Sequence, residues 1–199
     1  EEAVAVEEQC EELGRHGHFI QAKGIQEWPD GTLASQYRFV HALYREVLYE
    51  RVAAARRVQL HRLIGTRLEA GYAEQAGEIA AELAVHFGRG RDTQRAVQYL
   101  GQAGENAARK SAHREVIAHL TKGIDLLKTL PDTPERARQE LPLQLALGGP
   151  LIATTGYTTL ETRAAFGRAR ELCQQVGETP QLFTALSGLQ SFYLVRAEY

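Results

Sequence analysis

The sequence predicts a mainly α-helical protein with one β-hairpin near its start and an array of stacked helices over its last two thirds. Three observations predict this fold class. Two short stretches of extended character flank Pro29-Asp30-Gly31, helical periodicity sets in after residue 40, and apolar residues recur at the spacing of paired helices from Ala80 onward. Each element is justified below in chain order.

The composition places the chain among soluble globular proteins, with 44% hydrophobic and 24% charged residues in 199. A net charge of -2 gives no overall attraction to nucleic acid or to an anionic membrane. Cys10 and Cys173 lack metal-ligand or redox spacing, which favours two buried reduced thiols and a cytoplasmic setting. Because methionine is absent and the last residues read as the middle of a helix, we expect a piece of a longer protein.

The first 39 residues predict a helix followed by a hairpin. Val6, Cys10 and Leu13 lie at helical spacing, and Gly14 and Gly17 are expected to end that helix. Pro-Asp-Gly is strong turn chemistry, because proline fixes one backbone dihedral and glycine accepts a positive one. Alternation of apolar and polar residues over residues 33–39 then predicts the second strand of a β-hairpin.

Two helices are expected after the hairpin. His41 should lie at the start of the first, where Val40, Leu43 and Val47 form an apolar stripe. Phe39, Leu43 and Val47 are expected to fill a core. In the second helix, apolar residues recur every four positions over residues 60–68. Helix, hairpin and helix in this order predict a partial winged-helix domain over residues 1–70, whose leading helices would precede residue 1.

Arginines gather in the segment that follows the hairpin. Winged helices often bind DNA, but the helix before the hairpin is rich in glutamate and would repel a phosphate backbone. The arginines are therefore interpreted as a solvated face or, alternatively, as an interaction patch for an acidic partner. The candidate patch consists of Arg45, Arg51, Arg56, Arg57, Arg62 and Arg67.

The region 71–199 is predicted to be a tetratricopeptide (TPR)-like α-solenoid, truncated at its C-terminus. Small and large apolar residues there match the spacing of this helix-turn-helix repeat of about 34 residues. A second match lies 20 residues further along and shares one helix with the first, so the register of the repeats stays open. The first match consists of Ala80, Leu83, Ala84, Phe87, Ala96, Leu100 and Ala103; the second consists of Leu100, Ala103, Gly104, Ala107, Val116, Leu120 and Gly123.

Turns and breaks are also expected within this array. Residues 88–93 should form an inter-helix turn, and residues 130–136 should form a proline-bearing linker. Residues 147–150 should kink or interrupt a helix, because Pro150 cannot donate a backbone hydrogen bond. Thr158 or Thr159 is expected to cap the helix that carries Phe166.

The sequence offers no recognisable catalytic, cofactor or metal site. Residues 88–93 lack the lysine of a phosphate-binding loop, and His41 with Glu46 does not have the spacing of a helical zinc motif. His16 and His18 lack a third ligand. We therefore expect a non-enzymatic chain that holds no cofactor and no metal.

With these segments in order, the chain resembles the C-terminal region of bacterial STAND-class signalling ATPases. The resemblance lies in YRFVHALYREVLYERV, RRVQLHRLIGTRLE, AELAVHF, RAVQYLGQAGENA and VIAHLTKGIDLL. Such proteins join a P-loop ATPase core, a winged helix and a TPR array, and many carry an N-terminal class III adenylate/guanylate cyclase or transcriptional-activator domain. The resemblance implies that ATP and Mg belong only to an upstream part of a parent protein.

The resemblance implies a regulatory and sensor module that binds proteins. The winged helix would pack on the ATPase core, and the repeats would bind a protein partner or a small-molecule effector. Neither nucleic acid nor a membrane is expected as a partner. Two alternatives stay open: a nucleic-acid-binding winged-helix regulator, and a small-ligand-sensing TPR domain.

Overall fold

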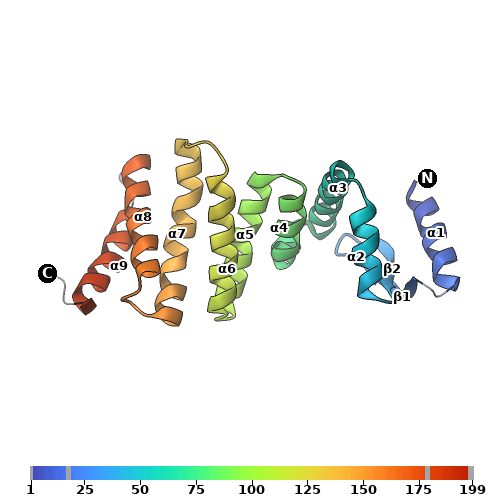
Figure 1. Cartoon of the computed structure of the whole chain (residues 1–199), viewed down its shortest axis with the longest axis horizontal. Helices are drawn as coiled ribbons and strands as arrows, with labels where there is room; N and C mark the ends of the chain where they lie inside the picture. Colours follow the sequence, from blue (N-terminus) through green and yellow to red (C-terminus); the bar gives the residue numbers. More distant parts are fainter. Residues whose placement is uncertain (1, 17–18, 178–179, 197–199) are drawn as a thin grey trace. The chain divides into compact units, whose positions relative to one another are not determined.

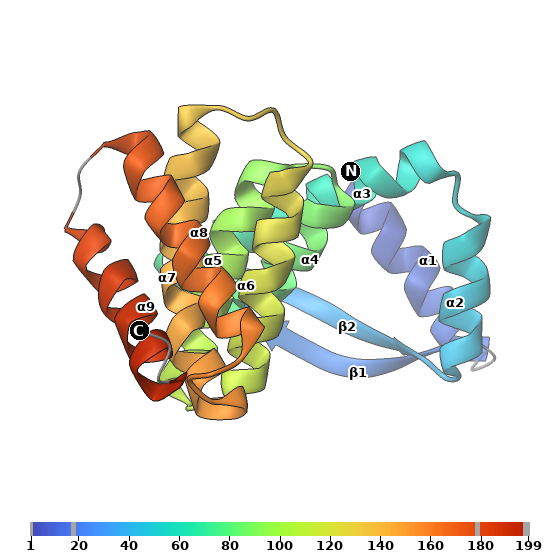
Figure 2. The same ribbon diagram turned by 60° about the vertical axis from the view of Figure 1, so that its left-hand side comes forward.

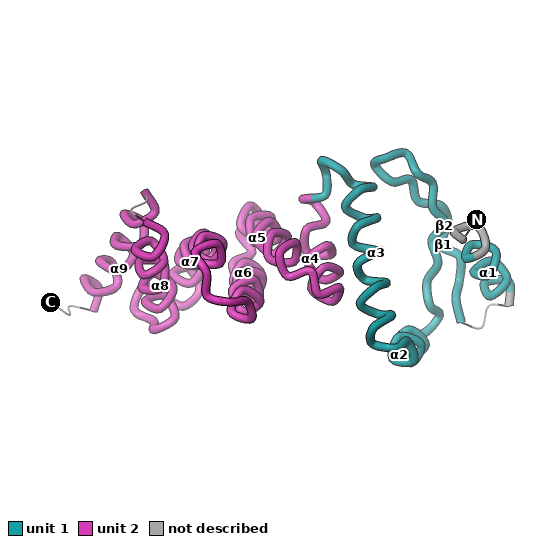
Figure 3. Tube along the Cα trace, turned by 90° about the horizontal axis from the view of Figure 1, so that it is seen from above, with its two compact units in different colours: residues 1–76 teal, residues 77–199 magenta. Residues whose placement is uncertain are grey.

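The computed structural model describes residues 2–16, 19–177 and 180–196. Among these residues the chain is mainly α-helical and contains one two-stranded antiparallel hairpin (Figure 1), which confirms the predicted fold class. The chain divides into two compact units, residues 1–76 and residues 77–199 (Figure 3). The predicted boundary between residues 70 and 71 lies six residues before the observed one.

Unit 1 has the expected order of helix, hairpin and helices. Its elements are α1 (Glu2–His16), β1 (Ile20–Glu27), β2 (Leu33–Phe39), α2 (Ala42–Arg51) and α3 (Ala54–Tyr72). The predicted turn joins the strands: the Gly31 N–H donates to the Trp28 carbonyl at 2.8 Å, and Gly31 has a φ of 79°. Helix α1 runs through Gly14, so the prediction that this glycine ends it is wrong. Gly17 lies outside the described residues.

The hairpin contains a bulge near its middle. Ala22 pairs with Tyr37 and Gly24 pairs with Gln36, so Lys23 is an extra residue on β1. Gly24 has a φ of 127°, a conformation that a residue with a Cβ atom rarely adopts. Bulges of this kind bend a strand and increase its twist locally.

The predicted core of unit 1 is wrong, because α2 has no buried residue at all. Leu43 is 54% exposed and Val47 is 41% exposed, while Phe39 is half-buried. The stripe has the predicted helical spacing, but unit 1 provides no second layer to cover it. The start of α2 is as predicted, since His41 caps it by accepting a hydrogen bond from the Leu43 N–H at 3.1 Å.

Unit 2 is a helical array in which consecutive helices pack side by side (Figures 1 and 2). A 3-10 helix, η1 (Ala73–Ile79), spans the boundary between the units. The array itself consists of α4 (Ala80–Arg89), α5 (Thr93–Arg109), α6 (His113–Lys128), α7 (Pro134–Thr155), α8 (Leu160–Val176) and α9 (Gln181–Arg196).

The core of the array lies at the positions that the repeat spacing predicts. All seven residues of the first match are at most 3% exposed, and all seven of the second match are buried as well. Small residues among them allow close approach: a Cβ at Gly104 would lie 2.8 Å from the Leu120 side chain. The buried positions are therefore confirmed, while membership of the TPR class stays a prediction.

The first two turns of the array are alike and lie 20 residues apart. The Asp92 N–H donates to the Phe87 carbonyl at 2.9 Å, and the Ala112 N–H donates to the Ala107 carbonyl at 3.0 Å. Residue Arg91 (φ 56°) and Ser111 (φ 55°) both take the left-handed conformation that ends such helices. The equivalence explains why the sequence matches the repeat twice at a displacement of 20.

Two other expectations concern α7 and α8. Helix α7 continues through Pro142 and Pro150 to Thr155, so no interruption occurs near residue 150. One lost hydrogen bond does not end a helix that packs against α6 and α8 along its length. Thr133 and Thr159 cap α7 and α8 by accepting backbone N–H groups from Arg136 and Thr162, which confirms the cap expected at residue 158 or 159.

One aromatic ring joins the last three helices. Phe166 of α8 lies between Gly148 of α7 and Gly188 of α9. An added Cβ would come within 2.2 Å of the ring at Gly148 and within 2.5 Å at Gly188. Both glycines are therefore required by the close approach of the ring, and not by their backbone conformation.

Candidate functional site

The hairpin turn is fixed to α3 by one arginine. The Arg67 guanidinium donates to Asp30 Oδ2 at 2.8 Å and to Thr32 Oγ1 at 2.9 Å, and it lies 4.5 Å from the centre of the Trp28 ring. Trp28 fits against α3 only because residue 71 is glycine: a Cβ there would lie 2.3 Å from the ring. We call Trp28, Asp30, Thr32, Arg67 and Gly71 the hairpin clamp.

The clamp holds the Asp30 carboxylate in its charged form. Hydrogen bonds from the backbone and side chain of Thr32, and then from Arg67, lower the pKa of Asp30 from 3.8 to about 2. The folded-state pKa is depressed, so the clamp is intact above pH 3.8 and is lost as the pH falls towards 2.

Because Trp28 is the one tryptophan of the chain, its fluorescence reports on the clamp. Arg67→Ala is expected to shift the emission to longer wavelength, because the ring loses its cation and becomes more hydrated. Gly71→Ala should shift it as well, by displacing the ring. Arg56→Ala, on the same helix and exposed, is the control and should leave the emission unchanged. An Asp30→Asn variant should differ from the wild type at pH 4 and match it near pH 2; equal spectra at pH 4 would contradict the clamp.

The predicted arginine patch is divided among different environments. Arg67 is used within the clamp, and Arg57 lies over the Tyr49 ring at 5.1 Å. The Tyr49 hydroxyl lies 3.0 Å from His61 Nε2, which ties α2 to α3. Arg45, Arg51 and Arg56 are exposed and have no ion pair among the described residues, and Arg62 is exposed on α3.

The largest uncovered apolar surface of unit 1 lies on α2 and just before it. Phe19 contacts Tyr44 edge to face, with ring centres 5.2 Å apart, and the Val40 N–H donates to the Phe19 carbonyl at 2.9 Å. Leu43, Val47 and Leu48 continue this surface at helical spacing, and the exposed fractions of the set run from 38% to 54%. The α2 apolar face is defined as Phe19, Val40, Leu43, Tyr44, Val47 and Leu48.

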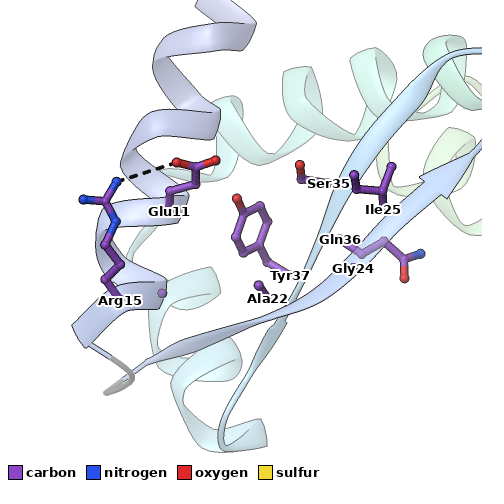
Figure 4. A pocket seen from close by; sticks show the side chains of 9 residues that line it. Glu11, Arg15, Ala22, Gly24, Ile25, Ser35, Gln36 and Tyr37 are labelled. Carbon is purple, nitrogen blue, oxygen red and sulfur yellow. Dashed lines mark ion pairs between the residues drawn. The ribbon is translucent and has the colours of Figure 1, made fainter.

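A hollow of about 530 Å³ lies between α1 and the hairpin. Figure 4 shows Tyr37 pointing from β2 towards α1, where Glu11 and Arg15 form an ion pair at 3.7 Å. Partial burial, and then the negative groups Glu11, Cys10 and Glu7, raise the pKa of the Tyr37 hydroxyl, so it stays protonated at neutral pH. The hollow thus has no activated nucleophile or base, and its exposed apolar residue Ile25 marks it as uncovered surface.

The array contains a buried ion pair between α7 and α8. Both carboxylate oxygens of Glu140 accept from Arg168, at 2.9 and 3.2 Å, and Gln144 donates to the same carboxylate at 3.1 Å. Burial raises the pKa of Glu140, but the hydrogen bonds from Arg168 and Gln144 outweigh it and hold the pKa below its ordinary value. This pair is saturated by its own partners, which indicates a structural role.

The described residues show no metal cluster. In 2–16, 19–177 and 180–196, no three His, Cys, Asp or Glu side chains lie close enough together to hold an ion. His18 lies outside these ranges. Cys10 and Cys173 are both free; Cys173 is buried, but Cys10 is only partly covered, which corrects the expectation of two buried thiols. No helix of the described chain is long and apolar enough to cross a membrane.

The comparisons with known proteins give one relative. An uncharacterized protein of Rhizobium meliloti (strain 1021) is 27% identical over 139 residues, which are 70% of this chain and 14% of that protein. The chain therefore spans about a seventh of a relative that is roughly 1,000 residues long, since 139 divided by 0.14 is about 990. No protein-family model matches the chain, and no solved structure matches it significantly.

Proposed function

We propose that this chain is a non-catalytic regulatory and protein-interaction module of a larger signalling ATPase. Unit 1 docks on a partner domain through the α2 apolar face, and the helical array recognises an effector. The observation that carries the proposal is α2, a helix with an apolar stripe and no buried residue. Each helix of the array, in contrast, has a buried stripe.

The α2 apolar face is suited to a protein partner. Contiguous exposed apolar surface on a folded chain marks an interaction site, since burying one such side chain contributes roughly 1.5–3 kcal/mol. Arg45 and Arg51 are exposed on the same helix. We therefore assign the partner as a protein domain that presents an apolar groove with an acidic rim.

Duplex DNA is a weaker candidate for the partner. The exposed glutamates Glu7, Glu8, Glu11 and Glu12 of α1 make the helix before the hairpin acidic. Base-reading helices depend on neutralising phosphates, which an acidic helix cannot do.

The ATPase half of the proposal is supported by the order of segments that resembles STAND-class proteins. It is also supported by the length of the Rhizobium meliloti relative, because roughly 1,000 residues correspond to several domains. The catalytic and nucleotide-binding parts would then belong to other domains of the parent.

The test compares Nile red binding to the wild type and to a Leu43→Glu/Val47→Glu variant. Nile red is uncharged, so it reports apolar surface independently of the arginines. The wild type is expected to enhance its fluorescence several-fold and to self-associate in sedimentation velocity, and the double variant should lose both. Phe183→Glu, at a side chain that is 77% exposed on α9, is the matched control and should behave as the wild type.

Three results would contradict the proposal. The first is a wild-type chain that is monomeric and binds no dye. The second is appreciable ATP hydrolysis by the purified chain, since no catalytic constellation accounts for it. The third is a coding region without a GxxxxGK[ST] motif upstream of this chain, which would remove the ATPase core.

A further inference from the structure

A cleft of about 430 Å³ lies on α8 and is bounded by two side chains of α9. Its lining is distinct from the α2 apolar face and from the buried Glu140 pair behind it. Arg163, Gly167 and Arg170 of α8 lie along it, and Leu189 and Tyr193 of α9 form its apolar side. A volume of this size is in the range of small-molecule sites, which is roughly 300–1,000 Å³.

Two of the arginines that line the cleft are without a carboxylate partner. Arg168 also lines it, but its guanidinium is bound by Glu140 and by Glu171, at 3.1 Å from the latter. Arg163 and Arg170 form no ion pair with any described residue. The cleft therefore has two available cations in a chain whose net charge is -2.

The two arginines lie on the same side of α8. Seven residues are nearly two helical turns, so their backbones are about 10 Å apart along the axis and their long side chains can converge on one group. Gly167 lies between them, and a Cβ there would meet nothing within 4 Å. The floor of the cleft is thus open backbone between two cations.

Aromatic rings restrict the first arginine. The Arg163 guanidinium carbon lies 5.9 Å from the ring centres of both Phe192 and Tyr193. Cation–π contacts of this kind hold the guanidinium over the rings while its N–H groups stay available to an anion. Tyr193 is 38% exposed and Leu189 is 8% exposed, so an apolar body can lie against them.

We propose that this cleft binds a small organic anion whose carboxylate or phosphate lies between Arg163 and Arg170, over Gly167, with its apolar body against Leu189 and Tyr193. Guanidinium groups match both oxyanions through paired hydrogen bonds. In regulatory terms the inference rests on the proposed function, because this anion would be the effector of the array. Binding itself is a property of unit 2 and does not depend on the α2 apolar face.

The test is calorimetric titration of the whole chain, at constant ionic strength, with phenyl phosphate, benzoate, inorganic phosphate and phenol. We expect phenyl phosphate or benzoate to bind with a Kd of about 1 mM or tighter, and inorganic phosphate and phenol to bind at least fivefold more weakly. The stronger of the first two identifies the source as phosphate or carboxylate. Arg163→Ala and Arg170→Ala should each weaken binding about tenfold or more.

Gly167→Leu gives the sharpest variant, because its side chain fills the cleft without meeting the core. It is expected to abolish binding while leaving the melting temperature unchanged or higher. Gly149→Leu in α7, where an added Cβ also meets nothing within 4 Å, is the control and should bind as the wild type. Absence of binding by both aromatic anions at 10 mM would overturn the inference, as would undiminished binding by Gly167→Leu. Either failure would leave the Nile red result, and the docking proposal, untouched.

Discussion

Arg168→Ala is expected to destabilise the chain by about 3–5 kcal/mol, because it leaves a buried carboxylate without its counter-ion. The Glu140 side chain is only 4% exposed, and the remaining hydrogen bond from Gln144 does not neutralise its charge. Urea denaturation at pH 7 measures the effect. Arg170→Ala, two residues further along α8 and exposed, is the matched control and should change the free energy of unfolding by less than about 0.5 kcal/mol.

Two further measurements separate charge from packing at this pair. A Glu140→Leu/Arg168→Met variant should recover most of the stability, because no buried charge remains. The loss in Arg168→Ala should also shrink below pH 4.5, the ordinary pKa of the group. The folded-state pKa of Glu140 is depressed, so its stabilising contribution is present above that pH and is lost as the pH falls further. A penalty that is equal at pH 7 and pH 4 would contradict the electrostatic explanation.

Gly188→Ala and Gly148→Ala are each expected to destabilise the array by about 1–3 kcal/mol, because the new methyl group overlaps the Phe166 ring. Gly149→Ala and Gly167→Ala are controls of unusual value, since both lie inside the same helices with open space at the Cβ position. These two should stabilise the chain by about 0.5–1 kcal/mol, the ordinary benefit of replacing a helical glycine. The difference in melting temperature between neighbours 148 and 149 checks the prediction directly.

The ring itself supplies the second part of this test. Phe166→Leu should relieve part of the damage in Gly188→Ala, because the smaller side chain makes room for the methyl group. Additive losses in the double variant would show that the glycine is required for another reason.

Features that depend on neighbouring residues could be predicted from the sequence. Pro29-Asp30-Gly31 fixes the hairpin turn, His41 and Thr159 cap the helices that follow them, and the repeat spacing locates the core of the array. In each case a short range of chain carries the information, since turns, caps and helix faces are set within a few residues.

Features that depend on tertiary contacts were missed. Glu140 and Arg168 are 28 residues apart, and nothing in their spacing indicates that they meet. Arg67 was assigned to a surface patch, although its partner Asp30 had been recognised only as a turn residue. For α2, the apolar stripe was correct but its burial was not, because periodicity shows which face is apolar and not whether anything covers it.

Packing between consecutive helices has a consequence for how the array loses its structure. In unit 2 the main contacts join helices that are adjacent in the chain, apart from a smaller contact between α7 and α9. Stability in such an array is nearly a sum over neighbouring pairs, so one end can melt while the other stays folded. Heat should therefore release α8 and α9 first in variants that weaken Phe166, and hydrogen exchange in α4 and α5 should stay slow while exchange in α9 accelerates.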